Sequence, residues 1–199
     1  MINKKYEMTT TVIHTWGKNL YRIKALKSFG DVKAGDLGGY IEDEDNLSQD
    51  GNSWIYDDAR VYENARVSGN ASIHDNVEVL CGAKVFENAK VSGKAMIYGN
   101  AKVHGNASIY GDAKVCGNAE VFGDAIVCDN VSVHDNAKIY DTAFVYDNAE
   151  IFGNAKVYGN VIVCNNAMVF DNAEIFGNFN VHDDMEICGD SKINGSKKV

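Results

Sequence analysis

The amino-acid sequence predicts an all-β protein: a single-stranded parallel β-helix with a small β cap at its N-terminal end. Three observations support this prediction. Hexapeptides repeat from Asn52 to Asn194 without insertion or deletion, and every sixth residue from Ile55 to Ile193 is Val or Ile, 24 times in succession. The position two residues earlier is Ala in 17 of these 24 hexapeptides, and the chain contains no Pro. A short and strict period of this kind is typical of solenoids.

Each hexapeptide is expected to form a short strand followed by a tight corner. Ala and Val/Ile two residues apart face the same side of an extended chain, and β-branched residues suit such a surface. The dipeptide that follows is typically Gly-Asn or Asp-Asn, as at Gly105-Asn106 and Asp135-Asn136. Since Gly, Asn and Asp tolerate a positive φ, each hexapeptide ends in a corner. Stacked coils then bury a continuous column of Val/Ile and Ala.

The first 51 residues follow a different pattern. Residues known to favour strands cluster at positions 8–14 and 20–26 around Trp16-Gly17, which predicts a β-hairpin. We predict a β cap over residues 1–51, the hexapeptide-repeat β-helix over 52–196 and a short tail over 197–199. A cap would cover the open backbone edge of the first coil. The alternative is a partner-binding head, and the thinly covered opposite end predicts tail-to-tail association.

The hexapeptide resembles a known motif, aliphatic-Gly-x-x-small-x, at its aliphatic and small positions, for example Val157 and Val161. This motif belongs to the hexapeptide-repeat proteins of the trimeric LpxA-like superfamily, which are left-handed parallel β-helices. At the second position, where those proteins prefer Gly, this chain has Tyr, Phe, His or Cys. The resemblance implies triangular coils of three hexapeptides, so 24 hexapeptides make 8 coils. At about 4.8 Å per coil the rod would be roughly 40 Å long.

A closer resemblance covers the N-terminal third of the chain. Its segments are LYRIKAL at 20–26, FGDVKAGDLGGYI at 29–41 and NLSQDGNSWIYD at 46–57. They are similar to the start of YdcK-like proteins, which are common in phages and prophages. The resemblance therefore implies a phage or prophage accessory protein, and it names a family without naming an activity.

Composition narrows the environment and the partners. A net charge of −9 argues against binding of duplex DNA. The N-terminus lacks the apolar segment of a signal peptide and no run reaches membrane-spanning length, so we expect a cytoplasmic protein without a membrane partner. The five cysteines lack CxxC spacing, which predicts free thiols in a reducing compartment; they are Cys81, Cys116, Cys128, Cys164 and Cys188.

If every third hexapeptide stacks, one outer face is apolar and is expected to be an oligomer interface. Contiguous apolar surface usually marks association, so the expected partner is the chain itself, in a homotrimer or another homo-oligomer. The alternative is local strand propensity without a partner. The interface residues predicted are Tyr110, Ile126, Phe144, Tyr146 and Ile162.

A second face interleaves cations with rings and is the candidate ligand face. Such a pattern can hold a nucleotide or single-stranded nucleic acid, or the rings can shield the strands while Lys stems lie across them. Its residues are Arg66, Lys84, Phe86, Lys102, His104, Phe122, Lys138, Tyr140, Lys156 and Tyr158. An acidic corner column could bind Ca²⁺, but Gly interrupts it and we expect a solvated edge; its members are Asp57, Asp75, Asp129, Asp147 and Asp183.

Catalysis is not the function that the sequence favours. Acyltransferases of the superfamily use a His base near bound CoA, whereas His74, His104, His134 and His182 stand where other hexapeptides have rings. The repeat also lacks the loop excursions that build a pocket, so we expect no catalytic residue, metal or cofactor. The predicted function is a non-catalytic, homo-oligomeric binding or scaffold protein that occupies a host protein or sequesters a nucleotide-type ligand. The alternatives are a CoA-dependent hexapeptide-type acyltransferase and a filament-forming structural protein.

Overall fold

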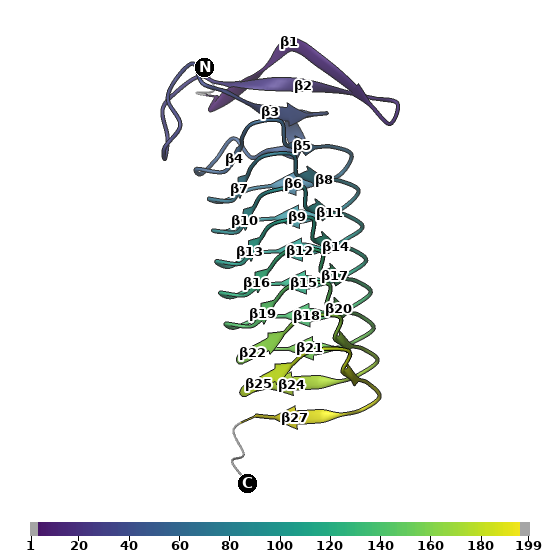
Figure 1. The fold of residues 1–199 in the computed structure, drawn as a ribbon. Helices are drawn as coiled ribbons and strands as arrows, with labels where there is room; N and C mark the ends of the chain where they lie inside the picture. Colours follow the sequence, from purple (N-terminus) through teal and green to yellow (C-terminus); the bar gives the residue numbers. More distant parts are fainter. Residues whose placement is uncertain (1–3, 196–199) are drawn as a thin grey trace.

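In a computed structural model, which describes residues 4–195, the chain forms a stack of coils with a β-hairpin at one end (Figure 1). Each coil passes in turn through three parallel sheets that run the length of the stack. The predicted β-solenoid is thereby confirmed. The predicted tail, residues 197–199, and residue 196 lie outside the described part of the chain.

We name one of the three sheets the long sheet because it has the most strands, and we name the other two, the basic sheet and the apolar sheet, by their outward side chains. The long sheet contains β1 (Tyr6–Thr15), β2 (Lys18–Ala25), β3 (Leu37–Ile41), β5 (Arg60–Val61), β8 (Glu78–Val79), β11 (Met96–Ile97), β14 (Lys114–Val115), β17 (Ser132–Val133), β20 (Glu150–Ile151), β23 (Met168–Val169) and β26 (Glu186–Ile187). The basic sheet contains β6 (Arg66–Val67), β9 (Lys84–Val85), β12 (Lys102–Val103), β15 (Glu120–Val121), β18 (Lys138–Ile139), β21 (Lys156–Val157), β24 (Glu174–Phe176) and β27 (Lys192–Asn194).

The apolar sheet contains β4 (Trp54–Ile55), β7 (Ser72–Ile73), β10 (Lys90–Val91), β13 (Ser108–Ile109), β16 (Ile126–Val127), β19 (Phe144–Val145), β22 (Asn160–Val163) and β25 (Asn178–Val181). A single 3-10 turn, η1 (Glu44–Asn46), precedes the first repeat. Among the described residues no helix is long and apolar enough to cross a membrane.

Parallel stacking begins before the first hexapeptide. β3 lies within the first 51 residues, yet it pairs in parallel with β5, placing Tyr40 beside Arg60. The apolar and basic sheets each have 8 strands, as 8 coils require, and β3 adds one further parallel strand to the long sheet. The start of the solenoid is therefore formed by a segment that does not follow the hexapeptide pattern.

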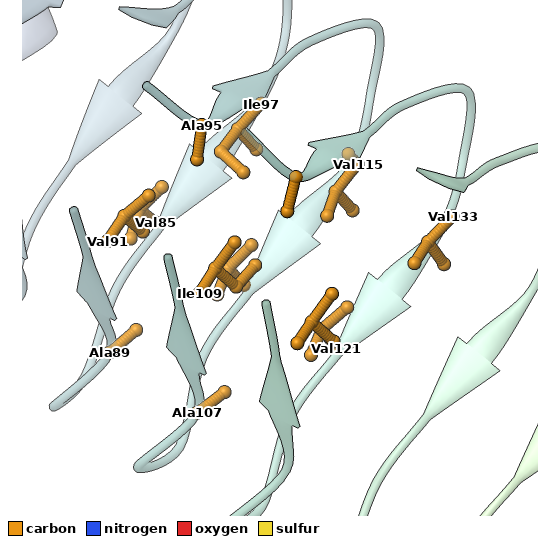
Figure 2. Close-up of a cluster of buried hydrophobic side chains, with 14 of the residues drawn as sticks. Val85, Ala89, Val91, Ala95, Ile97, Ala107, Ile109, Val115, Val121 and Val133 are labelled. Atoms are coloured by element: carbon orange, nitrogen blue, oxygen red, sulfur yellow. The ribbon is translucent and has the colours of Figure 1, made fainter. Parts of the chain in front are cut away.

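The core is the double column that the repeat predicts. The inward Val/Ile side chains and the Ala side chains are inaccessible to solvent through almost the whole stack, as Val115 and Ala113 illustrate. Figure 2 shows these side chains pointing into one continuous interior from the strands of successive coils. Ala is small enough to let three sheets approach one another, and each coil buries its apolar residues only because the next coil covers them.

Most strands are two residues long. Along each hexapeptide, every second backbone N–H donates a hydrogen bond to a carbonyl of the following coil. The N–H of Lys84 donates to the Ala101 carbonyl at 2.9 Å and that of Phe86 donates to the Val103 carbonyl at 3.0 Å. A third bond joins the corner of one coil to the next, from the Asn88 N–H to the Gly105 carbonyl at 2.9 Å. Proline at any of these positions would remove a bond between coils, which explains its absence from the repeat.

The corners carry their own side-chain ladders. The first corner residue has a positive φ, for example 59° at Asp135 and 69° at Gly105. The second is usually Asn, and its amide donates to the residue 18 positions later, as from Asn118 to Asn136 at 3.1 Å. Three such ladders end on a carboxylate that can only accept, at Asp124, Asp184 and Asp190.

The N-terminal segment contains the predicted hairpin. β1 and β2 pair antiparallel around Trp16-Gly17, so that part of the prediction is confirmed. The pairing register shifts between Met8 and Val12 because β1 is bulged there. A bulge interrupts the ladder of an edge strand and makes it a poor template for another chain. Behind the hairpin, the buried Asn46 amide donates to the Glu63 and Ala65 carbonyls, both at 2.9 Å, joining this segment to the first coil.

Candidate functional site

We call the outward residues Ser108, Ile126, Phe144 and Ile162 of the apolar sheet the apolar strip. This strip lies on the face where the sequence predicts the oligomer interface. Register pairs bring Ser108 beside Ile126, Ile126 beside Phe144, and Phe144 beside Ile162 on adjacent strands of the apolar sheet. No charged side chain occupies the outward strand position from β13 to β25. Tyr110 is 40% exposed at one border of the strip.

Aromatic packing extends the apolar strip to the neighbouring outward column, which contains Tyr146. The Phe144 and Tyr146 rings stack with centroids 4.7 Å apart, and both side chains are half-buried. Cys128 lies buried in the same outward column as Tyr110 and Tyr146, and its burial raises its thiol pKa to about 11. The five predicted interface residues therefore lie on one surface of the described chain. Their role in assembly stays a prediction.

The rings of the candidate ligand face form a continuous stack along the basic sheet. Neighbouring centroids lie between 4.6 and 5.1 Å apart and neighbouring planes are nearly parallel. The stack runs through Phe86, His104, Phe122, Tyr140, Tyr158 and Phe176. Because the faces of the rings inside the stack are covered by neighbouring rings, a base could reach only the edges of these rings. This geometry favours the alternative in which the rings shield the strands.

Polar ring edges are paired with glutamates 16 residues later. The Tyr158 hydroxyl donates to Glu174 Oε1 at 2.6 Å, and His104 Nε2 lies 3.2 Å from Glu120 Oε1. The same spacing joins Tyr62 to Glu78 and His134 to Glu150. Each glutamate thus belongs to the coil after its ring, and the pair fastens the two coils together.

Two of these glutamates also form ion pairs with lysines of the basic sheet, Glu120 with Lys138 and Glu174 with Lys192. Burial alone would raise the pKa of Glu120, but hydrogen bonds from Lys138 and His104 hold that pKa below its usual range. Hydrogen bonds from Tyr158 and Lys192 likewise lower the pKa of Glu174. Burial and the bond to Glu174 raise the pKa of Tyr158 in turn. All of these charges are satisfied within the fold.

The acidic corner column has a structural role. Asp75 Oδ2 accepts the Gly93 N–H of the next coil at 2.8 Å, and Asp147 Oδ2 accepts the Asn165 N–H at 3.1 Å. Asp57 and Asp129 make the equivalent bond to the coil that follows each of them. Within residues 4–195 no three His, Cys, Asp or Glu side chains gather as metal ligands would.

The four histidines of the repeat divide into two groups. His74, His104 and His134 each stack on a neighbouring ring, at 4.1 Å between the centroids of Tyr56 and His74. His182 does not stack on a ring among the described contacts, its side chain is 51% exposed, and its Nδ1 lies 2.8 Å from Asp183 Oδ2. It also stands on the apolar sheet side, in the outward column of Tyr146. Among the described histidines of the repeat, His182 is the most exposed one that has an adjacent carboxylate.

A hollow lies between the N-terminal segment and the basic sheet. Its volume is about 520 Å³ and its lining includes Lys18, Glu42, Asp45 and Arg66. Lys18 pairs with Glu42 at 2.9 Å and Arg66 with Asp45 at 3.7 Å, so its cations face carboxylates of the same chain. Sequence reasoning singled out neither this hollow nor a second one under Trp16, because both depend on where the hairpin lies over the coils.

Stacked hexapeptides, three parallel sheets and a core of Ala and Val/Ile define a β-solenoid repeat protein of the hexapeptide type. The chain matches the family described as the YdcK beta solenoid repeat over residues 55–69 and 59–75. It is also 48% identical over 52 residues to a protein of Escherichia coli (strain K12) named uncharacterized acetyltransferase YdcK. The aligned stretch covers 26% of this chain and 16% of the E. coli protein. Over these stretches the chain is similar to YdcK-like hexapeptide-repeat proteins.

Proposed function

We propose that the chain acts as a rigid, non-catalytic scaffold that associates with further copies of itself through the apolar strip. The observation that carries this proposal is the run of uncharged outward residues on the apolar sheet, where Ile126, Phe144 and Ile162 stand on adjacent strands. The outward strand position of the basic sheet is charged on every strand from β6 to β27. Charged outward residues keep a face in water, whereas contiguous apolar residues favour its burial against another surface.

The internal bonding of the other surfaces supports a scaffold. Corner carboxylates, ring-edge glutamates and Asn amides bond from coil to coil, which stiffens the rod and leaves these groups committed to the fold. What such a rod would hold, a host protein or a nucleotide-type ligand, is part of the same proposal. The added mass on the purified assembly would identify it.

Native mass spectrometry tests the self-association. Replacing Ile126 and Phe144 together by Lys places two charges in the strip and is expected to convert the assembly into monomer. Lys102→Gln with Lys156→Gln changes two outward residues of the basic sheet and is the matched control. Ile126→Thr with Phe144→Thr keeps strand propensity and is expected to weaken assembly without unfolding. A homo-oligomer that survives both strip variants would rule out this interface.

The second candidate function is CoA-dependent acetyl transfer. Two observations favour it: the E. coli relative is named an acetyltransferase, and His182 is an exposed imidazole beside Asp183 on the apolar sheet side. A carboxylate at Nδ1 would orient the ring so that Nε2 could serve as a general base. Acetyl-CoA turnover that is lost in His182→Gln, with the assembly unchanged, would establish this activity. Absence of both acetyl-CoA binding and turnover would exclude it.

A further inference from the structure

The turn between β1 and β2 carries a side chain that its backbone does not favour. Trp16 has φ 47° and Gly17 has φ 76°, and turns with two positive φ values prefer Asn-Gly or Asp-Gly. A bulky residue in this region is an outlier that costs free energy. Trp16 is nevertheless 85% exposed, so this cost brings no burial in the folded chain.

Trp16 overhangs a hollow on the long sheet. The turn projects beyond the coils at the top of the stack (Figure 1). A hollow of about 360 Å³ lies between Trp16 and side chains of the first coils. That volume is near the lower end of small-molecule sites, roughly 300–1,000 Å³. The hollow is lined by Trp16, Arg60, Asn76, Glu78, Lys94 and Met96.

The polar side chains of this hollow interrupt the ladders of the solenoid. Asn76 occupies the second corner position, where other Asn amides donate to an Asn or Asp 18 residues later. Its counterpart one coil on is Lys94, which offers no acceptor. Asn76 and Lys94 accordingly make no side-chain hydrogen bond or ion pair within residues 4–195. Arg60 Nε is buried without an acceptor, although Arg60 Nη1 lies 3.2 Å from Glu78 Oε1.

We propose that this hollow binds an acidic saccharide, with a hexuronate ring against Trp16. The indole presents a flat apolar surface that suits the C–H face of a pyranose ring, and Trp combines such a surface with a polar edge. The Asn76 amide can both donate to and accept from ring hydroxyls. In the described lining of the hollow, Lys94 is the cation without a carboxylate partner, and it would meet the carboxylate of the ligand in a charge-assisted hydrogen bond.

The charge of the site selects this ligand class over a nucleotide. Arg60 is already paired with Glu78, and Glu78 also accepts the Tyr62 hydroxyl at 2.9 Å. Among the described residues of the lining, Lys94 is the cation that no carboxylate neutralises, so it can pair with the carboxylate of one hexuronate ring, and the carboxylate of a further ring would lie in water outside the hollow. The adjacent phosphates of a nucleoside diphosphate or triphosphate would instead bring two or more charges against this one cation. Within residues 4–195 the lining contains one ring, that of Trp16, so a base would be stacked on one side alone.

Tryptophan fluorescence can read this site directly, because the chain has 2 Trp residues and Trp54 is 1% exposed. Acrylamide quenching should therefore report mainly on Trp16. Digalacturonate is expected to protect Trp16 in a saturable way, and neutral digalactose to bind at least roughly tenfold more weakly. Lys94→Met and Asn76→Ala are expected to weaken digalacturonate binding by a similar factor. Lys114→Met, on the same sheet but outside the hollow, is the matched control.

Isothermal titration calorimetry measures the same affinities without using tryptophan fluorescence. It can therefore also measure the affinity of Trp16→Ala, which lacks the reporting side chain. Folding of each variant is checked by circular dichroism. No saturable change with digalacturonate up to about 10 mM would overturn the proposal. Equal affinity of Lys94→Met and the unaltered protein would also overturn it. Tighter binding of a nucleoside diphosphate than of digalacturonate would refute the saccharide assignment.

Discussion

At the scale of the residue, a position in the repeat decides what a side chain can do. A ring in the outward column stacks on the rings of neighbouring coils, so His104 is held between Phe86 and Phe122. An acid at the first corner position bonds the next coil, as Asp75 does. Residues outside the repeat are placed individually, and Lys5 is the clearest case because its side chain is fully buried.

Lys5 makes stability depend on pH. Burial lowers its pKa from 10.5 to about 8, although Asp50 partly opposes the shift, and its Nζ donates to the Ser53 carbonyl at 2.9 Å. Between these pH values the unfolded chain binds more protons than the folded one. The contribution of Lys5 to the free energy of unfolding should therefore rise with pH in that window, by at most about 1.4 kcal/mol per unit.

Denaturant unfolding between pH 7.5 and 9 measures this contribution as the difference in slope between the unaltered protein and Lys5→Met, because cysteines and tyrosines that ionise in the unfolded chain affect both proteins equally. Lys5→Met should remove the contribution, and Lys24→Met, at an exposed position on β2, should keep it. An identical slope in Lys5→Met would show that another group is responsible.

At the scale of the element, a two-residue strand is held by what lies on either side of it. Its own ladder bonds are few, so the corner amides extend the bonding around each coil. Asn118 accepts from Asn100 at 3.4 Å and donates to Asn136 at 3.1 Å. Asp124 accepts from Asn106 at 2.9 Å and ends its ladder, since Thr142 follows one coil later.

The direction of the ladder can be tested with two opposite substitutions. Asn118→Asp keeps an acceptor but loses the donor to Asn136, and should cost about 1 kcal/mol of unfolding free energy. Asp124→Asn keeps the acceptor that Asn106 needs and should be neutral within about 0.5 kcal/mol. Thermal unfolding of both variants provides the comparison. Equal effects would mean that the ladder has no preferred direction.

At the scale of the whole molecule, stability is a sum over coils and their interfaces. Contacts join residues one coil apart, and the ladder bonds all span 18 residues. Any whole coil can therefore be removed without moving a ring, an amide or an inward Val away from its neighbours. Removal of a fraction of a coil shifts every later residue to another environment.

Two deletions separate these cases. Deleting residues 100–117 removes one coil and should leave a cooperatively folding, slightly less stable rod. Deleting residues 100–108 removes half a coil and puts corner residues such as Asn118 and Asp124 at the inward Val/Ile positions, so the chain below it should not fold. Circular dichroism and size-exclusion chromatography distinguish the outcomes. A stable rod after the half-coil deletion would contradict the register described above.

Most of the fold was predictable because the repeat is local and periodic. Val/Ile and Ala at fixed positions indicate which side chains face inward, and Gly, Asn and Asp indicate the corners. The composition of two outer faces followed from stacking every third hexapeptide. The ring stack and the pairing of Tyr158 with Glu174 were also accessible, since the same spacing of 16 residues recurs in the sequence.

Other features depended on contacts between parts of the chain that share no period. The sequence by itself determined the solenoid, its core columns and its charged and apolar faces, because each hexapeptide repeats the same steric and hydrophobic requirements. Only the tertiary structure decided that β3 extends the long sheet and that Lys5 is buried against Ser53. It also decided that Trp16 overhangs Asn76 and Lys94. These arrangements depend on how a non-repeating hairpin packs across the first coils, and no local pattern encodes that packing.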